Sequence, residues 1–182
     1  MEKKNNPAKY FLQIMYAHTI AYWIAGIFAL FAMNYKRYFS SEIISAFMKP
    51  VDAPIVALGP VLQIFRGLLI ALILLPLRKV FFDEKYGLIK LGITVFGFSY
   101  LSTIGPGIGS FEGYIYTIIP WTYQIVGLPE TVVYILLFIG ILHISIKYEQ
   151  RKIISILSIV FMAVIIFLGI MGYISAYYAL QV

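Results

Sequence analysis

The chain contains no cysteine among its 182 residues. Disulfides, thiolate nucleophiles, cysteine-ligated zinc and iron–sulfur clusters are therefore excluded, and no redox compartment can be inferred. Charged side chains are also scarce, because Asp, Glu, Lys and Arg make up 12% of the sequence, against about a quarter in an ordinary soluble domain. A surface this poor in charge cannot face water over most of its area, which excludes a soluble domain and indicates a protein embedded in lipid.

Catalytic and metal-binding patterns are missing as well. The sequence holds two histidines, His18 and His143, and no HExxH motif, so it indicates no zinc site. Ser110 and His143 are expected at opposite sides of the membrane, which excludes them as a nucleophile and its base. We find no enzyme signature and expect no cofactor and no bound metal. A lipid-modifying enzyme acting at the outer loop is the weakest of three functional alternatives.

The net charge of +6 does not indicate a nucleic-acid partner, because the basic residues lie at the ends of apolar runs. In that position basic residues are typical of topology signals in membrane proteins. We therefore expect the lipid bilayer to be the main partner, and no nucleic acid.

What the sequence does have is long apolar runs, and a helix needs about 20 such residues to cross a bilayer. The runs predict an all-α integral membrane protein, a single polytopic domain with a bundle of five transmembrane helices. A broken or re-entrant outer segment, 110–127, separates the third helix from the fourth, and a short helix over 39–49 is expected on the membrane surface. The expected spans are 10–33, 54–78, 87–106, 129–147 and 153–175.

The distribution of basic residues supports five crossings and sets an orientation. Five crossings place ten Lys and Arg residues on one side and three on the other, whereas six crossings give seven against six. The N-terminus is therefore expected in the cytoplasm and the C-terminus outside. We expect the cytoplasmic (inner) membrane of a prokaryote. The ten are Lys3, Lys4, Lys9, Arg78, Lys79, Lys85, Lys90, Lys147, Arg151 and Lys152, and the three are Lys36, Arg37 and Lys49.

Arg66 is the residue that the bilayer should tolerate least. It is expected near the middle of the second span, where an arginine costs about 2.5–3.5 kcal/mol on insertion scales and needs an anion, carbonyl groups or water. Gln63, His18, Ser99 and Thr103 are expected at similar depth, so the five residues form a candidate substrate-binding layer. For the hydroxyl groups we favour the plainer interpretation that each bonds its own i−4 carbonyl. Arg66 is equally well interpreted as a tie between helices.

Residues 105–113 hold four glycines and a proline, so the third helix cannot continue through them. Ser110 followed by Glu112 predicts the start of a short helix. Together with Arg66 and His18, this helix start favours a carboxylate, a phosphate or a lipid headgroup as ligand. Glu112, with Ser110 beside it, is then a counter-ion or gate for Arg66, or alternatively a static structural pair. Glu130 is assigned to capping the dipole of the fourth helix.

Our first functional hypothesis is a small permease or channel-like protein that binds a small anionic or zwitterionic group around Arg66. The alternative is a non-transporting membrane subunit, immunity protein or scaffold in which Arg66 and Glu112 lock the bundle. Small residues recur at positions 17, 21, 25 and 29 and again at 169, 172 and 176. Such stripes allow close helix packing, within the chain or, less often, in a homo-oligomer or larger membrane complex.

Overall fold

A computed structural model describes residues 7–179, and every regular element in that range is helical. Four helices are long and apolar enough to cross a membrane. They are α1 (Pro7–Ala32), α5 (Gly59–Leu74) with its 3-10 extension η1 (Leu75–Leu77), α9 (Leu128–Lys147) and α10 (Lys152–Ala179). The all-helical class expected from the sequence is therefore confirmed, and these four helices are candidate membrane spans.

The segment expected to be the third span is shorter than the other four. It consists of α6 (Gly87–Phe96) and the π-helical turn η3 (Gly97–Leu101), which together cover about 22 Å at 1.5 Å per residue. The helix ends before Gly105 and Pro106, because these residues favour non-helical backbone. Length alone thus leaves α6 and η3 below the roughly 30 Å of a hydrocarbon core.

Short helices connect the long ones. The expected 54–78 span is divided, because α4 (Pro54–Ala57) ends at Leu58 and Pro60 lies in the first turn of α5. Of the expected surface helix over 39–49, the single turn α3 (Glu42–Ser45) is helical, after α2 (Tyr35–Phe39). The remaining short elements are η2 (Lys79–Asp83), α7 (Phe111–Tyr116) and α8 (Trp121–Gln124).

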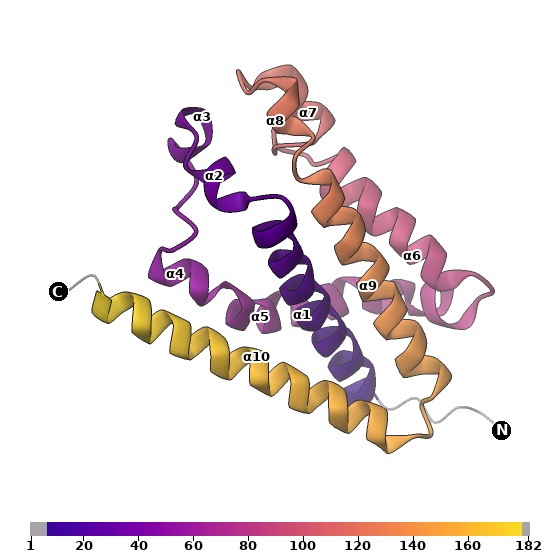
Figure 1. Ribbon diagram of the computed structural model, residues 1–182. Coiled ribbons are helices and arrows are strands. Elements are labelled where there is room, and N and C mark those ends of the chain that lie inside the picture. Colours follow the sequence, from indigo (N-terminus) through magenta and orange to yellow (C-terminus); the bar gives the residue numbers. More distant parts are fainter. Residues whose placement is uncertain (1–6, 180–182) are drawn as a thin grey trace.

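Helix α1 is the centre of the packing, since it contacts α5, α9 and α10 (Figure 1). Its small residues Ala17, Ala21, Ala25 and Ala29 are all buried inside the chain. The second stripe also serves internal packing, because a Cβ at Gly169 would lie 3.2 Å from the carbonyl oxygen of Ala57. Both stripes therefore bring helices of the same chain together.

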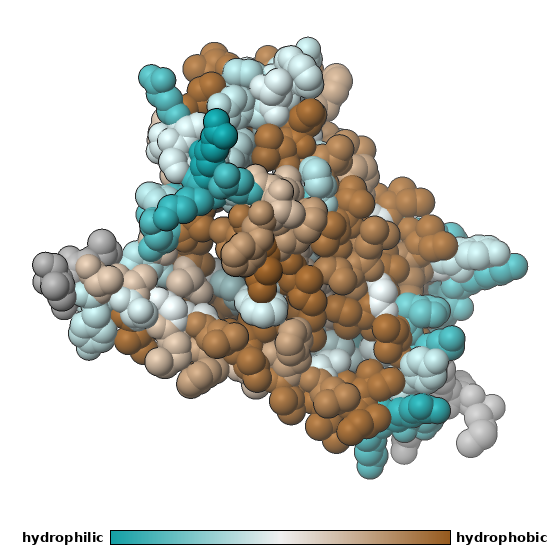
Figure 2. Space-filling model, viewed as in Figure 1, coloured by the Kyte–Doolittle hydropathy of each residue, from teal (hydrophilic) through white to brown (hydrophobic). Residues whose placement is uncertain are grey.

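The molecule has two polar ends. At one end, which we call the basic end, Lys9 pairs with Glu149 at 3.1 Å and the Arg78 guanidinium lies 4.8 Å from the ring centre of Tyr10. At the other, the aromatic end, the Tyr38 hydroxyl donates to the carbonyl of Tyr123 at 3.1 Å. Figure 2 shows an apolar band on the surface between hydrophilic patches at opposite edges of the view. This layout is the one expected of a protein that spans a bilayer.

Candidate functional site

A network of polar side chains joins α1, α5 and α9 in the interior of the bundle. His18 is fully buried, and its Nε2 lies 3.0 Å from Oε1 of Gln63 while its Nδ1 lies 2.7 Å from the Tyr134 hydroxyl. The Gln63 amide nitrogen donates to the carbonyl of Gly59, which fixes Oε1 as the atom facing His18. Because Oε1 can only accept, Nε2 carries the proton, and the neutral imidazole accepts from Tyr134 through Nδ1.

Arg66 lies beside this network, near the middle of the 16-residue helix α5. Its charge interacts with His18, Tyr22 and Tyr134, so the guanidinium lies next to the contact between α1, α5 and α9. The arginine is exposed, with the exposed apolar side chains of Phe65 and Leu69 around it. Within residues 7–179 it forms no ion pair.

Two members of the expected polar layer lie elsewhere. The Ser99 hydroxyl donates to the carbonyl of Val95, its own i−4 residue, and Thr103 donates to the carbonyl of Gly105 at 2.7 Å. Helix α6, which precedes both residues, packs against α9. The structure therefore brings together Arg66, Gln63 and His18 and leaves the two hydroxyl groups outside their network.

The broken segment after η3 is held by side-chain caps. Ser110 caps α7, because its Oγ accepts from the backbone N–H of Gly113 at 3.0 Å, as the sequence predicts. Glu112 lies in the first turn of α7, which packs against α8 at the aromatic end. In the part of the chain that the structure describes, Glu112 forms no ion pair with Arg66 or with any other cation.

Sequence reasoning missed Gln124, which satisfies the backbone of this segment. Its side chain is buried, accepts from the N–H of Gly109 at 2.7 Å and donates to the carbonyl of Gly113 at 3.1 Å. Gly113 itself packs so closely on this loop that a Cβ there would lie 2.0 Å from the carbonyl oxygen of Gly107. The sequence signal that could have identified Gln124 is its position as an isolated amide side chain in an apolar stretch rich in glycine and proline.

A crevice of about 510 Å³ opens between α1 and α10 at the aromatic end. It lies where α10 diverges from α1 and α9 (Figure 1). Its lining includes Tyr22, Trp23, Tyr35, Phe39 and the carboxylate of Glu130. The sequence assigned Glu130 to the helix dipole. Glu130 does stand in the first turn of α9, but its side chain also faces this crevice.

The Glu130 carboxylate accepts a hydrogen bond from the Tyr35 hydroxyl at 2.5 Å. Burial raises the pKa of Tyr35 well above its usual value of 10, and the bond to Glu130 raises it further, so the phenol remains a donor at physiological pH. Tyr22 interacts electrostatically with both Glu130 and Arg66. Tyr22 thus lines the crevice and also interacts with the arginine, a role that the sequence did not reveal.

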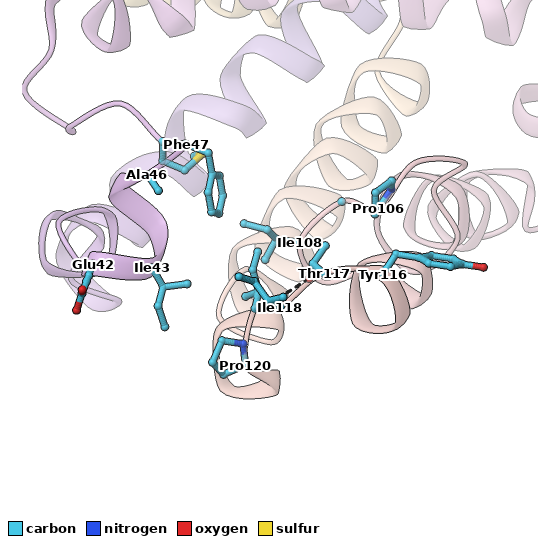
Figure 3. Close-up of a pocket in the computed structure, with 13 residues that line it drawn as sticks. Glu42, Ile43, Ala46, Phe47, Pro106, Ile108, Tyr116, Thr117, Ile118 and Pro120 are labelled. Atoms are coloured by element: carbon cyan, nitrogen blue, oxygen red, sulfur yellow. Dashed lines mark hydrogen bonds between the residues drawn. The ribbon is translucent and has the colours of Figure 1, made fainter.

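A second, larger cavity of about 1010 Å³ lies between α3 and the loops of residues 106–120. Figure 3 shows Ile43 and Phe47 on one side of it and Ile108 and Ile118 on the other. Of the described residues that line it, Glu42 is the one that carries a charge. The cavity is thus an apolar gap between outer loops and holds none of the sequence-predicted site residues.

Among residues 7–179 no group of three or more His, Cys, Asp or Glu side chains is arranged to hold a metal ion. The chain matches no family model, no curated protein and no solved structure. Its function is therefore inferred from the chemistry of its own residues.

Proposed function

We propose that this chain is a small permease or channel-like membrane protein that binds a small anionic or zwitterionic group at a polar site centred on Arg66. The observation that carries the proposal is a guanidinium in the middle of α5 that has no carboxylate partner within the described residues 7–179. A charge at that depth in a bilayer is costly, and an anionic ligand offsets the cost.

The neighbouring network gives the site its shape. His18, Gln63 and Tyr134 bond to one another in a fixed order, so their side chains are held in place. The N–H groups of Arg66 are not used by a carboxylate in this part of the chain, and they match the two oxygens of a carboxylate or phosphate. No contact supports a role for Ser99, Thr103, Ser110 or Glu112 here, so the proposal retains Arg66, Gln63 and His18 and adds Tyr134.

The same proposal includes five crossings, with the basic end in the cytoplasm. Helix α6 and turn η3 connect η2 at the basic end to the loops at the aromatic end, which supports a short fifth crossing. The basic end carries the Lys9 and Arg78 contacts, and basic residues are retained on the cytoplasmic side. The expected prokaryotic inner membrane stays a prediction.

Thermal unfolding of the protein in nanodiscs tests ligand binding at Arg66. Phosphate, acetate, glutamate and glycine betaine serve as probes, and a bound ligand raises the unfolding temperature with its concentration. We expect at least one probe to stabilise the wild type and to have no effect on Arg66→Gln. Lys79→Gln removes a basic residue at the basic end and is the matched control that keeps the shift.

Two results would count against the proposal. One is a panel in which no probe stabilises the wild type. The other is a shift that persists unchanged in Arg66→Gln, since the ligand would then lie elsewhere. If the protein is a permease, a stabilising probe must also enter proteoliposomes. Its rate of entry must be higher with the wild type in the membrane than with Arg66→Gln.

One observation favours the non-transporting subunit as a second candidate. Arg66 is exposed on an apolar face of α5, between Phe65 and Leu69, where a helix of another protein can pack. Arg66 and Glu112 are not paired, so this candidate needs a carboxylate from a different chain. It predicts no stabilisation by the small probes and a more stable isolated chain after Arg66→Leu, because the substitution removes an unpartnered charge.

A further inference from the structure

We propose that the crevice beside Glu130 binds an alkylammonium group, either on a soluble organic cation or on the headgroup of a lipid. The proposal goes beyond the anion site at Arg66 and does not depend on it. It rests on the lining of the crevice, the partners of its carboxylate and its position at the aromatic end.

Among the described residues, four aromatic side chains take part in the otherwise mainly aliphatic wall of the crevice. Tyr22 and Trp23 come from α1, while Tyr35 and Phe39 come from α2, where their rings stack 5.2 Å apart. Cations bind over the faces of such rings, and cages of aromatic side chains recognise quaternary ammonium ligands. The wall therefore offers the surface that an alkylated ammonium group requires. A strongly hydrated metal ion is not matched by such a surface.

Glu130 supplies the negative charge. Among residues 7–179 it is the one charged residue that lines the crevice, and its hydrogen-bond partner there is the neutral Tyr35 hydroxyl. Its position in the first turn of α9 stabilises the carboxylate through the helix dipole but leaves its net charge uncompensated. A monovalent cation in the crevice neutralises this charge without displacing the bond from Tyr35.

Arg66 acts against a cation, but from outside the crevice. It does not line the cavity, although its charge interacts with Tyr22, which does. The cavity volume of about 510 Å³ falls within the range of small-molecule sites. The crevice is therefore large enough for a trimethylammonium group, and the guanidinium limits how deeply the positive charge can enter.

The fluorescence of Trp23 offers a direct test, because the chain has two tryptophans and Trp121 lies outside the crevice. In Trp121→Phe protein, Trp23 is the single reporter. We expect choline to change its emission saturably, and 3,3-dimethyl-1-butanol, which has the same shape without the charge, to bind about tenfold more weakly or not at all.

Substitutions in the same background test the role of the carboxylate. Glu130→Gln is expected to weaken choline binding about tenfold or more, whereas Glu42→Gln, which removes an acid near the aromatic end but outside the crevice, leaves it unchanged. Tyr35→Phe keeps the ring and frees the carboxylate, so binding is retained or tightened. Circular dichroism shows whether each variant is folded.

The lipid composition distinguishes the two sources of the ammonium group. If phosphatidylcholine headgroups occupy the crevice, free choline binds more weakly in phosphatidylcholine nanodiscs than in phosphatidylglycerol nanodiscs. Equal binding identifies a soluble cation as the ligand. The proposal is overturned if Trp23 does not respond to choline in phosphatidylglycerol nanodiscs, or responds equally to the neutral alcohol. Both results need only the Trp121→Phe protein, whose folding is compared with that of the wild type by circular dichroism. Arg66→Gln is expected to tighten choline binding, so failure here and failure of the anion site are separable.

Discussion

Gln124 and His18 show how single polar side chains organise an apolar chain. Gln124 accepts from the N–H of Gly109, which lies in the broken segment, and donates to the carbonyl of Gly113, which also accepts from Thr117. His18 performs a similar task between helices, where it joins Gln63 of α5 to Tyr134 of α9. In surroundings this apolar, an unsatisfied polar group is expensive, so each amide or imidazole acts on several elements at once.

The first prediction concerns Gln124. Replacement by Leu removes the partner of the Gly109 N–H and the bonds that the amide donates to the carbonyls of Gly113 and Ile119, and we expect the free energy of unfolding to fall by about 1–3 kcal/mol. Equilibrium unfolding in mixed detergent micelles measures the loss. Thr122→Ala, at an exposed position of the same short helix, is the control and should have little effect. Equal losses for the two variants would show that the bonds of Gln124 are not important.

Part of the residue-scale picture was predictable from the sequence. Counting residues along the spans places His18 and Gln63 at similar depth, and the structure does join them. Depth alone does not say which helices are neighbours, however. For that reason the sequence placed Ser99 in the same layer, whereas in the structure its hydroxyl bonds to Val95 of its own segment. The sequence also did not find Tyr134.

At the scale of elements, α1 organises the bundle through close contacts of small residues. Gly67 of α5 faces α1 so closely that a Cβ there would lie 3.0 Å from the Cα of Met15 and 3.5 Å from the His18 ring. Small residues at such contacts replace the hydrophobic driving force that helices lack in lipid. The position of α5, and with it the position of Arg66, therefore depends on this glycine.

The second prediction compares the same substitution at two glycines. Gly67→Ile should lower the free energy of unfolding by about 1–3 kcal/mol, because the side chain cannot fit between α1 and α5 without displacing them. Gly140→Ile, in α9, meets open space and should change it by less than about 0.5 kcal/mol. Chemical unfolding of both variants in the same micelles measures the two changes in the free energy of unfolding. A loss at Gly140 as large as that at Gly67 would contradict the packing.

The long elements were predictable because a long apolar run has few ways to satisfy its backbone in lipid other than as a helix. The expected spans 10–33, 129–147 and 153–175 correspond closely to α1, α9 and the first part of α10. The lengths of the second and third expected spans depend on a few helix-breaking residues. Pro60 divides the second run at Leu58, and the glycines and proline after Ile104 shorten the third, so hydropathy alone overestimated both.

At the scale of the whole molecule, the two ends differ in chemistry. The basic end gathers the contacts of Lys9 and Arg78, and the aromatic end gathers Tyr38 together with Tyr35 and Glu130, which line the crevice. An apolar band separates the ends (Figure 2). With the basic end in the cytoplasm, the crevice opens to the outside.

The third prediction tests this orientation in intact cells. The chain has no cysteine, so single substitutions give unambiguous labelling with a membrane-impermeant maleimide. We expect Ser40→Cys, near the aromatic end, to react from outside, and Lys85→Cys and Gln150→Cys to react after the cells are opened. Reaction of position 85 or 150 in intact cells would reverse the orientation or change the number of crossings.

The central claim is that Arg66 lies deep in the hydrocarbon core, and the depth of its neighbour Phe65 tests this most directly. A nitroxide attached to Phe65→Cys in nanodiscs reports its depth through relaxation by oxygen, which is concentrated in the membrane, and by a water-soluble nickel complex. We predict strong relaxation by oxygen and weak relaxation by nickel, as expected near the bilayer centre. Strong relaxation by nickel would place this turn of α5 at the headgroups, and Arg66 would then need no ligand.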